Sequence, residues 1–94
     1  MKIEKLKVIR ADERGTMYDC DKLKCIERKK GTISADHSHD DKEILYLIKG
    51  DVELTVEKSV RTVKSPARIE IPPKAYHKLL ALSDIILLED RKLE

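Results

Sequence analysis

Three histidines and one glutamate of this chain are spaced as the ligands of a metal ion would be. His37 and His39 are separated by one residue, Glu43 follows four residues later, and His77 lies in a second segment, residues 72–77. Residues i and i+2 of an extended strand point to the same face, so the imidazoles of His37 and His39 can converge on one point. Imidazole nitrogens and a carboxylate oxygen together suit a first-row divalent ion. The sequence therefore predicts a metal site formed by these four residues.

The spacing of this first segment also matches a known family motif. Gly31, His37, His39, Glu43 and Gly50 fill every fixed position of the first cupin motif, which reads Gly, five residues, His-x-His, three residues, Glu, six residues, Gly. The chain therefore resembles a small single-domain cupin, with motif one at residues 31–50.

The second cupin motif, at residues 66–81, is degenerate. Pro72 and His77 match it, whereas Pro66, Lys74 and Ala81 stand where the family has Gly, Gly and Asn. The resemblance implies an all-β, double-stranded β-helix (jelly-roll) barrel formed by one domain, residues 1–94. It also implies a divalent metal ion, Fe, Mn, Zn or Ni, held inside by the matches to His37, His39, Glu43 and His77.

The hydrophobic pattern predicts β structure independently of the motifs. Apolar and polar residues alternate with a period of two, turn residues separate the segments, and no segment has a helical stripe. Many short strands without helices indicate a sandwich or barrel. We expect strands over residues 2–10, 23–28, 43–49, 51–57, 60–64, 67–71, 76–82 and 84–90.

Strand parity places side chains on the inner or the outer face. If Glu43 points inward, so do Leu45 and Leu47, and the same holds for His77 and Leu79. The expected pocket is therefore aliphatic, and no Phe or Trp is present to stack on a sugar or a base. In the second motif, Pro73 favours a type I turn that would leave Lys74 at negative φ.

The open positions of such an ion set the expected function. Three imidazoles and one carboxylate leave two octahedral positions for water, dioxygen or a bidentate small molecule. We expect a metal-dependent enzyme that acts on a small molecule and is either dioxygenase-like or isomerase-like. An isomerase would need a base, and the candidates are Tyr46, Tyr76 and Glu43. The alternative is a non-catalytic module that binds a small ligand or a metal, because no acid or base is obvious beyond the ligand set.

Composition limits the partners and the environment. Lys and Arg number 20 against 18 Asp and Glu, and the two signs are interspersed, so neither nucleic acid nor a membrane is expected as a partner. We interpret the basic run of residues 28–30 as a solvated turn, because no aromatic residues interleave it. The absence of Asn and Gln suggests a thermophilic source. The absence of a targeting signal suggests a cytoplasmic protein. Cys20 and Cys25 are then expected as thiols, with a disulfide between them as the alternative.

A homodimer is expected from the distribution of apolar residues. Ile44, Tyr46 and Ile48 are apolar at positions that should face outward, and residues 79–82 and 85–88 are apolar on both faces. Exposed together, they would form a larger patch than soluble monomers usually carry. A second copy is the expected cover, and the N-terminal segment, residues 2–10, folding across the sheet is the alternative.

Overall fold

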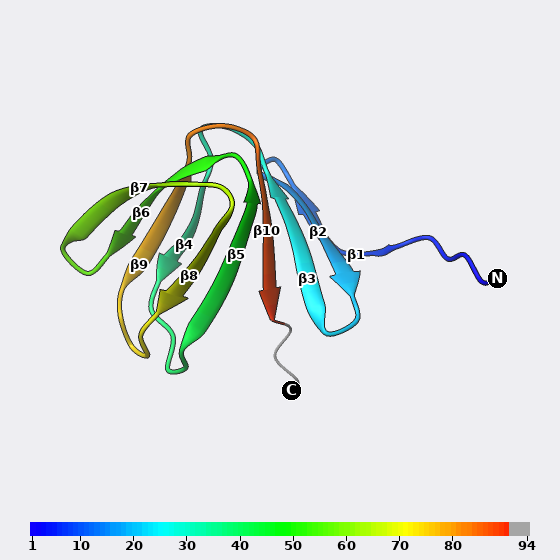
Figure 1. Ribbon diagram of the computed structural model, residues 1–94, viewed down its shortest axis with the longest axis horizontal. Helices are drawn as coiled ribbons and strands as arrows, with labels where there is room; N and C mark the ends of the chain where they lie inside the picture. Colours follow the sequence, from blue (N-terminus) through cyan, green and yellow to red (C-terminus); the bar gives the residue numbers. More distant parts are fainter. Residues whose placement is uncertain (91–94) are drawn as a thin grey trace.

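Ten strands account for the regular structure of residues 1–90, the part of the chain that the computed structural model describes (Figure 1). These residues contain no helix, and hence no helix long and apolar enough to cross a membrane. The strands are β1 Lys7–Asp12, β2 Gly15–Cys20, β3 Leu23–Arg28, β4 Ile33–His37, β5 Glu43–Lys49, β6 Asp51–Val56, β7 Ser59–Lys64, β8 Ala67–Ile71, β9 His77–Ala81 and β10 Ile85–Asp90.

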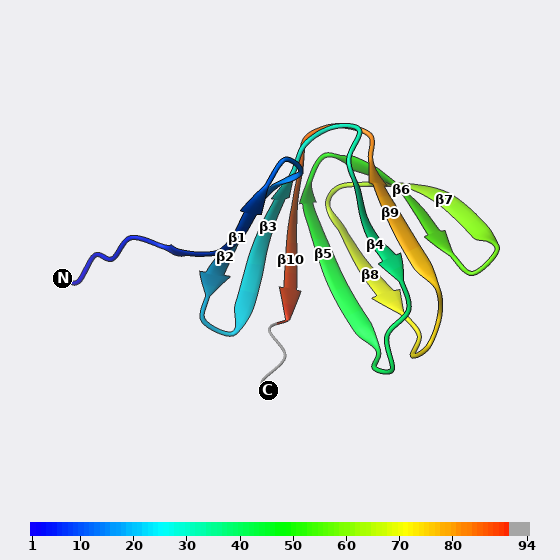
Figure 2. The same cartoon turned by 180° about the vertical axis from the view of Figure 1, so that it is seen from behind.

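The strands form two antiparallel sheets. One has six strands in the order β1-β2-β3-β10-β5-β8, and the other has four in the order β4-β9-β6-β7. The views from the two sides show β5 and β8 of the larger sheet opposite β4 and β9 of the smaller one, while β1, β2 and β3 extend beyond it (Figures 1 and 2). The all-β jelly-roll architecture expected from the sequence is confirmed.

The alternating pattern predicted eight of the ten strands. It missed β2 and β4, since the sequences GTMYDC and ISADH carry no regular alternation of apolar and polar residues. The first strand also begins at Lys7 rather than at residue 2. Both missed strands take their position from neighbours: β2 pairs with β1 and β3, and β4 pairs with β9.

The core lies between the two sheets and is aliphatic. Strand β5 has the burial alternation that parity predicted, with Glu43, Leu45 and Leu47 buried and Ile44 and Tyr46 only partly buried. Each fully buried aliphatic side chain contributes roughly 1.5–3 kcal/mol relative to an exposed one. The buried hydrophobic residues are Ile26, Leu45, Leu47, Val52, Leu54, Ile69, Ile71, Ala75, Leu79, Ala81, Ile85 and Leu87.

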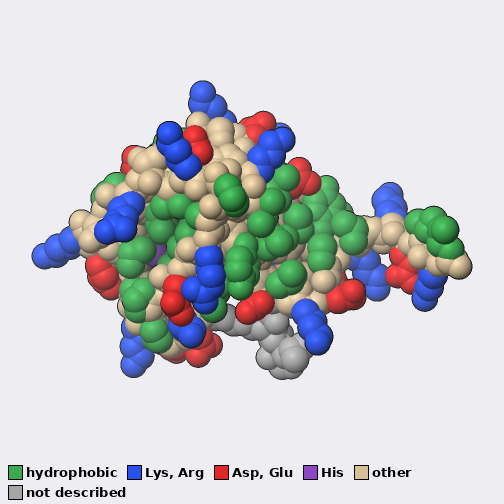
Figure 3. Space-filling model, viewed as in Figure 1, with side chains coloured by type: hydrophobic (Ala, Val, Ile, Leu, Met, Phe, Trp, Pro, Cys, Tyr) green, Lys and Arg blue, Asp and Glu red, His purple; other side chains and the backbone are tan. Residues whose placement is uncertain are grey.

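The centre of the outer face of the six-stranded sheet is also apolar. Strand pairing sets five side chains in one row across it, from β1 to β5: Val8, Tyr18, Cys25, Leu88 and Tyr46. We call this row the outer apolar row. On β8 the charged Arg68 follows Tyr46. In the space-filling view, hydrophobic side chains gather over this sheet (Figure 3).

One sequence expectation about this patch needs correction, and the alternative cover does not apply. Leu80 pairs with Ile33 and Glu53 in the four-stranded sheet, so the apolar residues of β9 do not join the patch on β5 and β10. The N-terminal segment does not cover the patch either, because β1 pairs at the edge of the sheet and residues 1–6 extend away from the body (Figures 1 and 2). Ile3 in that segment is 84% exposed.

Candidate metal centre

His37 is aimed by an irregularity at the end of β4. The register of β4 against β9 shifts between Ser34 and His37, and Ala35 has a φ of 56°. A bulge of this kind redirects the following side chain, and it sets His37 directly opposite His77 on β9. The prediction that His37 and His39 share one strand face is wrong, because β4 ends at His37 and His39 lies in the loop that follows.

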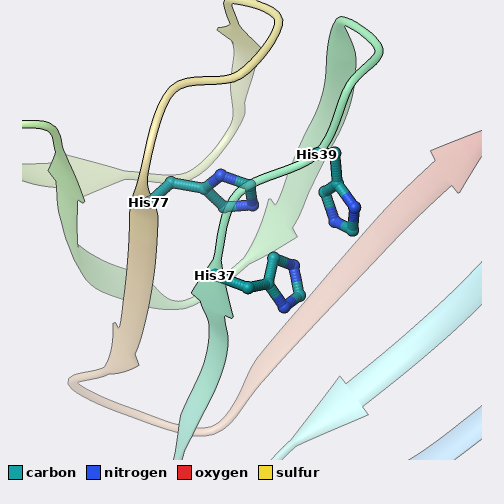
Figure 4. Close-up of side chains that lie close together, drawn as sticks. All are labelled: His37, His39 and His77. Atoms are coloured by element: carbon teal, nitrogen blue, oxygen red, sulfur yellow. The ribbon is translucent and has the colours of Figure 1, made fainter.

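The three imidazoles nevertheless point toward one another (Figure 4). Each offers a ring nitrogen, and these nitrogens lie within 4.8 Å of one another. His77 is buried, His39 is half-buried and His37 is the most exposed of the three. The group therefore opens toward solvent on one side, as a site that admits a small molecule must.

The hydrogen bonding of His77 sets the tautomer of its neutral ring. Nδ1 lies 3.1 Å from the carbonyl oxygen of Ala75. A carbonyl oxygen only accepts, so Nδ1 carries a proton and donates it, and in the neutral ring Nε2 is then the nitrogen with a free lone pair. This arrangement is usual for a histidine that binds a metal.

Glu43 completes the set of four predicted residues. Its Oε2 lies 2.9 Å from Nε2 of His77 and 3.6 Å from Nε2 of His39. The structure thus brings Glu43 and the three histidines together, although they come from both sheets and from the loop between β4 and β5.

The contact between Glu43 and His77 has a notable property. Both Oε2 and Nε2 are buried, and neither has a hydrogen-bond partner within residues 1–90, although the two atoms are only 2.9 Å apart. Two lone pairs at this separation repel each other unless a proton or a cation lies between them. Adjacent ligands at about 2.1 Å from an octahedral ion are about 3.0 Å apart. The residues present therefore fit a divalent ion.

The electrostatic environment keeps His37 neutral. Partial burial, followed by repulsion from His39 and His77, lowers the pKa of His37, and the attraction of Glu43 opposes this only in part. A lowered pKa means that the neutral imidazole persists to a lower pH than it would in water. Only the neutral form can bind a metal, so His37 is in the required state at neutral pH.

The turn between β8 and β9 differs from the prediction. Lys74 has a φ of 64°, whereas the sequence predicted a negative value. The amide of Ala75 donates to the carbonyl oxygen of Pro72 at 3.3 Å, which closes the turn, and the amide of Lys74 donates to the carbonyl oxygen of His39. The second bond ties the turn before His77 to the loop that carries His39, and it explains why the strained conformation is kept.

Replacing Lys74 by glycine should stabilise the fold by roughly 0.5–1 kcal/mol. A residue with a side chain destabilises the folded state by about 1–2 kcal/mol at this φ. Glycine avoids this strain, but its greater conformational entropy in the unfolded chain offsets about half of the gain. Urea denaturation of the two proteins measures the difference. Lys74→Ala is the matched control, because it removes the ammonium and keeps Cβ. Equal stabilisation of both variants would show that charge, and not backbone strain, is responsible.

A cavity of about 220 Å³ lies beside the histidines. Ile26, Leu45, Leu79 and Leu87 give it the aliphatic wall that the sequence predicted. The rest of the lining is more polar than predicted and includes four basic side chains. These are Arg10, Arg14, Lys24 and Arg28.

The burial of Arg28 was not predicted. The predicted strand 23–28 ends correctly at Arg28, but the interpretation of residues 28–30 as a solvated turn is wrong for this residue, which is 6% exposed. The available signal was strand parity: Ile26 points inward, and so must Arg28 two residues later.

The two tyrosines considered as bases do not serve that purpose. Tyr46 belongs to the outer apolar row, on the side of the sheet opposite the cavity. The hydroxyl of Tyr76 donates to Asp36, and this hydrogen bond raises the pKa of Tyr76. Of the three candidates, only Glu43 faces the cavity. Cys20 and Cys25 are free thiols, and Cys25 lies in the outer apolar row.

Comparison with known proteins places the fold. No family model and no curated protein sequence matches the chain. Among solved structures, an RmlC-like cupin from Shewanella frigidimarina is 19% identical over 71% of this chain and 60% of its own, with a TM-score of 0.66. The capsular polysaccharide assembling protein CapF from Staphylococcus aureus is 16% identical over 98% of this chain and 30% of its own, with a TM-score of 0.80.

A third similar structure is an enzyme. Salicylate 1,2-dioxygenase from Pseudoaminobacter salicylatoxidans is 15% identical over 73% of this chain and 22% of its own, with a TM-score of 0.64. The chain thus spans 60%, 30% and 22% of the lengths of these three proteins. At such identities the likeness establishes the fold alone. Together with the two antiparallel sheets, it shows that this chain has the cupin fold.

Proposed function

We propose that this protein binds a first-row divalent metal ion and acts through it on a small molecule. The observation that carries the proposal is the buried pair of Glu43 Oε2 and His77 Nε2, 2.9 Å apart and without a hydrogen bond. The ligands would be His37, His39, Glu43 and His77. The ion would be Fe, Mn, Zn or Ni, since all four accept a mixed set of imidazole and carboxylate.

The chain's own residues would prepare the site for chemistry. When bound, the ion would polarise an oxygen of the substrate or bind dioxygen beside it. The Ala75 carbonyl holds His77 in the tautomer that a ligand needs. The bond from the Lys74 amide to the His39 carbonyl fixes the loop of one ligand to the turn of another.

The reaction would be dioxygenase-like or isomerase-like. A salicylate dioxygenase has the same fold, so the fold is compatible with the first class. The second requires a base, and Glu43 would then have to serve both as ligand and as base, because neither Tyr46 nor Tyr76 faces the cavity. This shortage of bases favours the oxygenase of the two. It also keeps open the alternative of a module that binds a metal or a small ligand without turnover.

Metal analysis and turnover assays separate these functions. The protein is purified anaerobically, its metal content is measured, and oxygen uptake and isomer formation are followed with small 2-oxo acids, diketones and sugars. We expect one ion per chain and turnover of one class. One ion without turnover of any of them would favour the binding module. Absence of bound metal, even after addition of Fe(II), Mn(II), Zn(II) or Ni(II), would refute the proposal.

A further inference from the structure

Arg28 is a buried charge that the proposed metal chemistry does not use. Strand β3 buries Ile26 and Arg28 and exposes Glu27 between them, so the guanidinium points into the barrel. It lines the same cavity as His37, His39 and Glu43. A cation at this depth is uncommon unless it is paired.

The hydrogen bonds of Arg28 are incomplete. Nη1 donates to the carbonyl oxygen of Glu27 at 3.1 Å, but Nε is buried and has no hydrogen-bond partner within residues 1–90. A guanidinium offers its donors in a planar fork that matches the two oxygens of a carboxylate. The guanidinium lines the cavity and is thus suited to a planar anion.

Two carboxylates near Arg28, those of Asp12 and Glu89, compensate its charge only in part. Burial is the main reason that the pKa of Arg28 is lowered, and repulsion from Arg14 and Arg10 adds to it, whereas Asp12 and Glu89 oppose the shift. Asp12 already binds Arg14 at 2.8 Å, and Glu89 lies 3.7 Å from Lys24. A buried charge that is compensated only in part is costly to the folded state, which is expected where a residue serves binding rather than stability.

We propose that Arg28 binds the carboxylate of the substrate, so that the substrate is a small organic acid. A further oxygen of the substrate, from a carbonyl, enol or hydroxyl group next to the carboxylate, would bind the metal ion in the same cavity. This inference rests on the proposed function and narrows it, because it selects 2-oxo acids over the neutral diketones and sugars.

The test compares an acid with its neutral analogue. Pyruvate and pyruvamide have nearly the same shape and differ in charge. Their affinities for the Co(II)-loaded protein are measured by calorimetry and by the change in the Co(II) absorption spectrum. We expect pyruvate to bind at least tenfold more tightly than pyruvamide. In Arg28→Met this preference should vanish while Co(II) affinity stays within about twofold, and Arg28→Lys should keep only part of it, because an ammonium lacks the planar fork.

Lys49→Ala is the matched control. Arg28 also lines a second cavity, of about 350 Å³, to which Lys29 and Lys49 contribute. Lys49 does not line the cavity of the histidines, so its loss should leave pyruvate binding unchanged. A loss of pyruvate affinity in Lys49→Ala equal to that in Arg28→Met would place the anion in the second cavity and overturn the inference.

The remaining outcomes separate this inference from the proposed function. If Co(II) binds but wild type and Arg28→Met show the same preference for pyruvate, the role of Arg28 is refuted and the metal site stands. If no metal binds, the titration is repeated with the metal-free protein. A preference for pyruvate over pyruvamide that is lost in Arg28→Met supports the anion site, and the absence of such a preference refutes it. The urea midpoint of Arg28→Met should equal or exceed that of wild type. A fall in the midpoint together with the lost affinity would assign Arg28 a structural role instead.

Discussion

Replacing His39 by alanine should weaken the binding of Co(II) more than tenfold while leaving the fold intact. His39 lies in a loop with 39% of its side chain exposed, so its removal leaves no cavity in the core. The substitution would remove one of four ligands. Loss of a residue that only orients a ligand already lowers metal affinity 10–100-fold, so loss of a ligand itself should lower it by more than tenfold. Competition with a chelator, monitored by Co(II) absorption, measures the affinity, and circular dichroism reports the fold.

Asp40→Ala is the control for this experiment. Asp40 is an exposed residue of the same loop and does not belong to the group of converging side chains. Its substitution should change Co(II) affinity less than twofold. Unchanged stoichiometric binding in His39→Ala would show that other ligands hold the ion. The wild-type affinity should also fall as the pH is lowered, because protons compete with the ion for imidazole nitrogens.

We also expect the protein to sediment as a dimer at micromolar concentration, with twice the monomer mass of 10.8 kDa. The outer apolar row would otherwise face water, and Val8 within it is 54% exposed. Strand β1 is exposed along almost its whole length at the edge of the sheet, where its unpaired backbone groups can accept a second chain. A two-fold pairing of this face would bury on the order of 1,500 Å², with Tyr46 inside the interface.

Leu88→Glu should break this dimer. Leu88 lies in the middle of the row, between Cys25 and Tyr46, and a buried, unpaired carboxylate opposes association strongly. Leu80→Glu is the matched control, since Leu80 has a similar degree of burial on the outer face of the other sheet. Sedimentation of wild type at the monomer mass, or dissociation by both substitutions alike, would contradict a dimer through this face.

The sequence predicted those features that depend on local periodicity. The period of two gave most strands and their inner faces, as in β5, where burial alternates from Glu43 to Leu47. The features that it missed depend on partners far away in the chain. Lys74 takes positive φ because its amide reaches the carbonyl of His39, and Ala35 does so in a register shift against β9.

Arg28 was missed for a different reason. The basic run of residues 28–30 was interpreted as a solvated turn, and strand parity, which would have placed the side chain of Arg28 inward, was not applied to it. Burial of a charged side chain is unfavourable, so reasoning from stability alone favours the exposed placement. The same conflict can be used to search other sequences for binding residues.

The position of the converging side chains has a consequence for the lifetime of the protein. Glu43 belongs to the six-stranded sheet, whereas His37 and His77 belong to the four-stranded one. An ion shared among them would tie the sheets together in the folded chain only, and would add about 2.7 kcal/mol to its stability at a free metal concentration one hundred times Kd. Metal starvation would then raise the unfolded fraction about a hundredfold and expose the chain to proteases. The cellular amount of this protein would follow the metal supply without any dedicated regulator.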